Sequence, residues 1–225
     1  MRLVSIPPPG TWLSHAALAD ILRSRSTRTF LDVGCGSGHY SKLLCNMGLS
    51  GVGIDFGADA ITATTELLSE EIHSRKFHTI LADMASMPKL NQEFDLVISM
   101  MVLEHIEGDS DFVRKLVDHL AVGGTLVIAV PGRKEKWTFE DEIVGHVRRY
   151  ERRELEKLLS GVGIQNVGVW SVGVPTINML ARVRDRMVKI MLATFAPPHR
   201  VLVNRRSSLG FNKYPLRLYF RKYFD

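Results

Sequence analysis

The chain has 225 residues, of which 45% are apolar and 24% charged, and its formal net charge at pH 7 is +5. This length and apolar content suit one globular domain with a substantial core and exclude a disordered chain. The apolar runs are too short for a membrane-spanning helix or a signal peptide, and the two cysteines form neither a disulfide framework nor a metal-ligand pattern. We therefore expect a cytoplasmic protein.

The first predicted elements are a helix at 11–23, a strand at 29–33 and a helix at 39–47, with a glycine-rich turn before the second helix. Gly34, Gly36 and Gly38 let the backbone turn sharply and leave its N–H groups open to a ligand. The third glycine comes one residue too early for a dinucleotide fingerprint. The turn therefore predicts a different nucleotide-like ligand.

Further strands are predicted near 51–55, 77–82, 94–100 and 124–130, and helices near 57–72 and 110–120. This alternation predicts an α/β fold with a mostly parallel sheet covered by helices on both faces. Asp32, Asp55 and Asp83 lie at or just after the ends of the first three strands, so we expect the three carboxylates to share one crevice. Charges near a core are costly unless something uses them, which supports a ligand site there.

The motif D-x-G-x-G-x-G at 32–38, the later acids and the segment VLEHI at 102–106 resemble class I S-adenosylmethionine (SAM) dependent methyltransferases, in particular the bacterial small-molecule type. The resemblance covers roughly residues 28–165. It implies a Rossmann-like, doubly wound sheet that binds SAM and releases S-adenosylhomocysteine.

The resemblance also implies roles at the cofactor site. Asp32 would orient the glycine turn and reach the methionyl amine, Asp55 would hold the ribose hydroxyls, and Asp83 would accept from the adenine amino group. No metal site is expected. The other expected cofactor contacts are Gly34, Cys35, Gly36, Gly38, Tyr40, Phe56, Met84, Ser99 and Met100.

The pattern changes after Pro131, where a polar stretch precedes a helix at 152–160 and a predicted sixth strand at 166–172. Because this stretch leaves the carboxyl edge of the sheet, residues 131–150 are the expected substrate loop. The acceptor contacts expected in this loop are Trp137, His146, Arg148 and Arg149.

Imidazole titrates near neutrality and so suits removal of a proton from a hydroxyl acceptor. His146 is therefore the first candidate as base or acceptor anchor, because the resemblance places a histidine before this helix against the acceptor. His105 is the second candidate, with a structural role in its loop as the alternative. Tyr150 is a further catalytic candidate.

Positive charge is concentrated toward the C-terminus. Residues 131–225 carry 19 Lys and Arg against 9 Asp and Glu, whereas residues 1–130 carry 10 against 15. We expect a SAM-binding core at 1–175 and a basic, amphipathic extension at 176–225, helical or extended and packed on the core. Such a segment suits a phosphate-bearing or lipid-linked acceptor, or peripheral contact with the inner membrane surface. Nucleic acid is an unlikely partner because no recognition module accompanies the charge.

The sequence therefore predicts a SAM-dependent methyltransferase for a small-molecule, lipid-linked or phosphate-bearing acceptor. The alternatives are a SAM-binding protein without transfer activity, a nucleic-acid-modifying methyltransferase and a nucleotide-dependent oxidoreductase. Transfer to oxygen, nitrogen or carbon stays open, as does the choice between a monomer and a homodimer.

Overall fold

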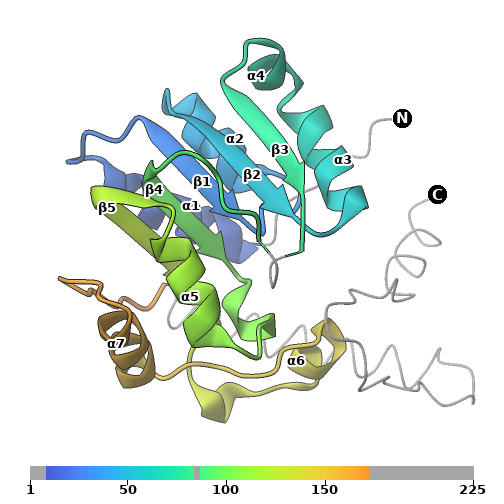
Figure 1. Cartoon of the computed structure of the whole chain (residues 1–225). Helices are drawn as coiled ribbons and strands as arrows, with labels where there is room; N and C mark the ends of the chain where they lie inside the picture. Colours follow the sequence, from blue (N-terminus) through green and yellow to red (C-terminus); the bar gives the residue numbers. More distant parts are fainter. Residues whose placement is uncertain (1–8, 84–86, 173–225) are drawn as a thin grey trace, which may run out of the picture.

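A parallel sheet of five strands, in the order β3-β2-β1-β4-β5, forms the centre of the molecule (Figure 1). The computed structural model describes residues 9–83 and 87–172. The parallel sheet confirms the predicted fold class and brings the carboxyl ends of all five strands to one edge. The strands are β1 (Thr29–Val33), β2 (Ser50–Asp55), β3 (Phe77–Leu81), β4 (Phe94–Met100) and β5 (Leu120–Ala129).

Both faces of the sheet are covered, because side chains alternate between the faces along each strand. In β1, Phe30 packs on one side and Leu31 and Val33 on the other. The Phe30 side is covered by α1 (Pro9–Leu22) and α2 (His39–Asn46), and the other side by α5 (Asp109–Val117) and α7 (Arg152–Gly161). This arrangement confirms the prediction of helices on both faces.

Two predicted elements differ clearly from the structure. The helix expected at 57–72 is divided into α3 (Ala58–Leu67) and α4 (Ser69–His73), and Leu68 between them is fully buried in the core under α2. Strand β5 begins at Leu120, four residues earlier than expected, with a shift of register opposite Phe94 and Leu96. The left-handed backbone of Gly123 fits this irregular start.

The stretch at 131–150 is more ordered than a polar loop. It contains the short helices η2 (Lys134–Lys136) and α6 (Phe139–Val144), and a single bridge joins Gly132 to Tyr150. Asp141 and Tyr150 are only 1% and 5% exposed. This polar stretch therefore contains two buried residues, Asp141 and Tyr150, whose polar atoms are hydrogen-bonded to other side chains.

The predicted sixth strand is also wrong, because residues 166–172 form no strand. Trp170 is 73% exposed, so this run gains little from burial of its largest side chain. The basic extension predicted at 176–225 lies outside the described residues. In the part of the chain that is described, no helix has both the length and the apolar character needed to cross a membrane.

Candidate cofactor and acceptor site

The glycine turn after β1 is open on one side and tightly packed on the other. A Cβ added to Gly34 would lie 2.2 Å from Cγ2 of Val102, so only glycine lets the segment after β4 pack against the turn. A Cβ added to Gly36 would meet nothing within 4 Å. Both glycines have positive φ angles, of 81° and 55°. The turn therefore presents bare backbone toward open space, as a closely bound ligand requires.

Asp55 fixes this turn from the end of β2. Its carboxylate accepts hydrogen bonds from the backbone N–H groups of Gly36 and Gly57, each 2.8 Å long. A carboxylate offers about four lone-pair positions, so acceptor positions beyond these two bonds are left for a ligand. Phe56 follows directly, and Asp83 lies two residues beyond β3, the strand that pairs with β2. Met84 is outside the described residues.

Asp32 lies in β1 on the side of α2, where Ser41 donates a hydrogen bond of 2.6 Å to its Oδ2. The side chain is 1% exposed, and Oδ1 has no hydrogen-bond partner among the described residues. Burial, together with the nearby charge of Asp55, raises the pKa of Asp32 to about 7. A buried oxygen without a donor is unusual in a folded protein, so this atom indicates a place where a ligand donor binds.

Tyr40 and Cys35 flank the turn in different ways. Tyr40 packs edge-on against His15 of α1, with ring centroids 4.6 Å apart, so α1 lies beside the turn. The thiol of Cys35 is buried 4.0 Å from the Thr64 hydroxyl, and burial raises its pKa. Only the backbone of Cys35 is therefore placed to contact a ligand.

The end of β4 contributes Ser99 and Met100. Asp32 pairs with Ile98 in the sheet, so alternation places Ser99 on the opposite face from Asp32. The Ser99 hydroxyl is buried without a hydrogen-bond partner among the described residues. Met100 returns to the face of Asp32 and packs in the core cluster under α1 and α2.

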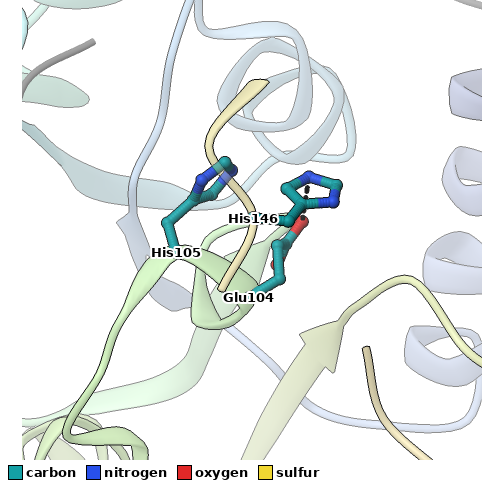
Figure 2. A group of neighbouring side chains, drawn as sticks. All are labelled: Glu104, His105 and His146. Atoms are coloured by element: carbon teal, nitrogen blue, oxygen red, sulfur yellow. Dashed lines mark ion pairs between the residues drawn. The ribbon is translucent and has the colours of Figure 1, made fainter. Parts of the chain in front are cut away.

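Three further side chains meet beyond β4. Glu104 and His105 belong to η1 (Leu103–His105), and His146 follows Gly145, which ends α6 in a left-handed conformation (Figure 2). His146 Nε2 lies 3.8 Å from Glu104 Oε1, and the two imidazole rings meet edge-on with centroids 4.8 Å apart. The pair of histidines predicted as catalytic candidates is thus brought together.

Asp141 holds His146 in place from α6. Its Oδ1 accepts a hydrogen bond of 2.7 Å from His146 Nδ1, and Arg149 binds both carboxylate oxygens at 2.8 Å. Burial alone would raise the pKa of Asp141, but the hydrogen bonds from Arg149, His146 and Thr138 outweigh it and hold the pKa at about 2. Asp141 is therefore a carboxylate that orients the imidazole.

The neighbours of His146 have different electrostatics. Glu104 is 0% exposed, and burial, with the charge of Asp141 adding to it, raises its pKa to about 8. Burial, followed by the effect of His146, lowers the pKa of His105. Glu104 and Asp141 were not among the site residues predicted from the sequence. The only sequence signals for them are the place of Glu104 in VLEHI and that of Asp141 five residues before His146.

Three residues that were predicted for the site form hydrogen bonds with other groups of the protein. Arg148 donates to Asp109 Oδ2 and to the carbonyl of Glu107, both at 2.7 Å, and the Tyr150 hydroxyl donates to Asp109 Oδ2 at 3.1 Å. Arg149 is bound to Asp141 as described. The contacts of Arg148 and Tyr150 fasten the loop to the start of α5, and Arg149 fastens it to Asp141 of α6. Roles of these three residues toward an acceptor stay predictions. Trp137, 40% exposed, stays a candidate acceptor contact.

Comparison with known proteins agrees with this geometry. Residues 12–169 match the family described as a methyltransferase domain. The chain belongs to the class I SAM-dependent methyltransferases. SAM is the cofactor of this family.

The similar proteins are distant relatives. A probable SAM-dependent methyltransferase of Mycobacterium tuberculosis is 25% identical over 69% of this chain and 56% of its own length. A malonyl-acyl-carrier-protein O-methyltransferase of Enterobacter lignolyticus is 26% identical over 76% and 68%. The chain thus spans only about half to two thirds of these relatives. A SAM complex of phosphoethanolamine N-methyltransferase 2 from Haemonchus contortus shares the fold, with a TM-score of 0.65 and 19% identity over 82% of this chain and 45% of that one.

Proposed function

We propose that this chain transfers a methyl group from SAM to an oxygen atom of a small acceptor that is anionic, phosphate-bearing or lipid-linked. His146 acts as the base or as the anchor of the acceptor. The observation that carries this proposal is the Oδ1 atom of buried Asp32, which has no hydrogen-bond partner among the described residues and lies beside the open glycine turn. The O-methyltransferase name of one relative supports oxygen as the methyl acceptor.

The residues at the carboxyl edge fit SAM by their chemistry. Asp32 Oδ1 is an acceptor for the methionyl ammonium group, and Asp55 has acceptor positions left for ribose hydroxyls. Asp83 is the corresponding acceptor for the adenine amino group. SAM supplies an activated methyl group on a sulfonium, so positioning accounts for much of the protein's task.

His146 is oriented for proton transfer. Because Asp141 accepts the hydrogen bond of Nδ1, the neutral ring carries its lone pair on Nε2. An acceptor hydroxyl gives its proton to Nε2 and keeps the electron pair on oxygen, which becomes the nucleophile, while Asp141 stabilises the imidazolium. Such a base contributes roughly 10² to 10⁴ in rate.

Calorimetry with SAM tests the cofactor half of the proposal. Asp55→Asn should weaken SAM binding by about 1.5 to 3 kcal/mol, the usual contribution of hydrogen bonds to a charged group. Asp59→Asn is the matched control, because Asp59 is exposed in the first turn of α3 and loses the same charge. A full-length chain that takes up neither SAM nor S-adenosylhomocysteine would refute the proposal.

The transfer half needs labelled SAM and a panel of hydroxyl-bearing phosphates and lipids. His146→Asn should lower the rate of label transfer while SAM affinity stays close to that of the unchanged chain. Equal transfer rates would remove His146 from the proposal. SAM binding without transfer to any acceptor would favour a protein that only binds SAM.

A further inference from the structure

We propose that Glu104, His105 and His146 bind one divalent transition-metal ion, such as Zn²⁺, Mn²⁺ or Co²⁺, at the acceptor end of the site. This replaces the sequence-based expectation of no metal. The metal site depends on the proposed function in one respect only: the acceptor is taken to bind at the coordination positions that the protein ligands leave open.

The first support is the set of donor atoms. One nitrogen from each histidine and one Glu104 oxygen all lie within 4.8 Å of one another (Figure 2). Ligand atoms around one such ion are about 3 to 3.5 Å apart, given metal–ligand distances of roughly 2.0 to 2.2 Å. The 3.8 Å between His146 Nε2 and Glu104 Oε1 is already close to that value, so small rotamer changes complete the set.

The second support is the orientation of both rings. His146 Nδ1 bonds to the Asp141 carboxylate at 2.7 Å, and His105 Nδ1 bonds to the carbonyl of Gly145 at 3.2 Å. Because both partners can only accept, both Nδ1 atoms carry the proton and both Nε2 atoms carry a lone pair. Metal-bound histidines usually donate their second nitrogen to such a carboxylate or carbonyl.

The third support is the carboxyl group of Glu104. It is fully buried, and neither oxygen has a hydrogen-bond partner among the described residues. Arg149, the nearby guanidinium, is bound to Asp141. Burying a carboxylate without a partner is costly, and a bound cation removes that cost. The orphaned group thus points to a ligand independently of the histidine geometry.

The donor chemistry selects the class of ion. Two imidazoles and one carboxylate suit Zn²⁺, Mn²⁺, Fe²⁺ or Co²⁺ better than Ca²⁺ or Mg²⁺, which prefer all-oxygen sites. Three protein ligands leave coordination positions open, as in catalytic sites. An acceptor oxygen occupies such a position, so His146 is then the anchor of the acceptor through the metal and not its base.

The test uses the full-length chain, stripped with a chelator and then titrated with Co²⁺ and Zn²⁺. We expect one ion per chain by elemental analysis, visible absorption from bound Co²⁺ and a much weaker response to Mg²⁺. Glu104→Gln and His146→Asn should each lower Co²⁺ affinity roughly tenfold or more, and Asp141→Asn, which removes only the orienting partner, roughly 10- to 100-fold. His78→Asn, an exposed histidine of β3, is the matched control and should change nothing.

SAM calorimetry on the same samples shows that each variant is folded. Absence of Co²⁺ binding, or equal binding in Glu104→Gln, His146→Asn and the unchanged chain, overturns the metal proposal. Either result leaves the proposed function standing if SAM still binds. The reverse result, metal binding without SAM binding, would overturn the proposed function and keep the metal site.

Discussion

At the scale of single residues, the site is defined by carboxyl groups that the fold buries. Asp55 and Asp141 receive hydrogen bonds on both oxygens, whereas Asp32 and Glu104 are left with oxygens that have no partner in the described structure. Carboxylates that accept hydrogen bonds on both oxygens hold loops in position, whereas buried carboxyl oxygens without a hydrogen-bond partner indicate where ligands bind. The structure therefore assigns different tasks to acids that look alike in the sequence.

The raised pKa of Asp32 makes stability depend on pH. Between its ordinary value of 3.8 and about 7, only the folded state keeps the proton, so this group lowers the free energy of unfolding as pH rises through that window. Asn at this position cannot ionise. From about pH 5 to about pH 8, the stability of Asp32→Asn relative to the unchanged chain should therefore rise by about 2 to 3 kcal/mol.

Urea unfolding of the SAM-free protein at the two pH values measures this difference. Asp59→Asn, which removes an exposed carboxylate from the same region, is the matched control. A constant offset between Asp32→Asn and the unchanged chain would show that Asp32 titrates normally in the fold.

At the scale of elements, the sequence predicted the regular strand–helix units well and the connections poorly. β1 was predicted at its exact bounds because its alternating faces are both apolar and glycines end it. The division of α3 from α4 was missed, since Leu68 continues the apolar pattern of a single helix. The false strand at 166–172 has strand-like residues but no partner strand within the described part of the chain.

The acceptor end could be predicted only in part for the same reason. The local motif indicated His105 and the substrate loop indicated His146, but their meeting depends on α6, which was not predicted. Asp141 and Arg149 form an ion pair across the loop after α6, and the spacing of apolar residues in the sequence does not reveal such a contact. Long-range polar contacts of this kind become visible only in three dimensions.

The glycine turn allows a test that separates backbone strain from ligand contact. Gly36 and Gly48 both have positive φ angles, and a Cβ at either would meet no atom within 4 Å. Alanine at either position should destabilise the fold by a similar amount, about 1 kcal/mol. Only Gly36→Ala places a methyl group in the open side of the turn, so it should weaken SAM binding roughly tenfold or more.

Thermal unfolding and SAM calorimetry of the two variants give the comparison. Gly48, at the end of α2, is the control for strain alone. Should both variants bind SAM like the unchanged chain, the open side of the turn is not the place where the cofactor binds.

At the scale of the whole molecule, acidic residues are in excess in one part of the chain and basic residues in the other. Residues 1–130 carry the excess of Asp and Glu, and residues 131–225 carry the excess of Lys and Arg. Several basic side chains of the described part are already paired, among them Arg148 and Arg149. Any attraction for an anionic surface is therefore expected to depend on the basic residues that follow residue 172.

The last prediction concerns binding to an anionic membrane. The full-length chain should sediment with vesicles that contain phosphatidylglycerol, less so at high salt, because Lys and Arg are attracted to anionic lipid by about 1 kcal/mol each. Replacing Arg182, Arg184 and Arg186 with Gln should then reduce vesicle binding roughly 100-fold. The matched control replaces three exposed arginines of the acidic part, Arg23, Arg25 and Arg114, and lowers the net charge equally. If both triple variants lose binding to the same extent, net charge and not residues 176–225 governs the interaction. If the unchanged chain stays in the supernatant at low salt, residues 176–225 do not bind an anionic membrane.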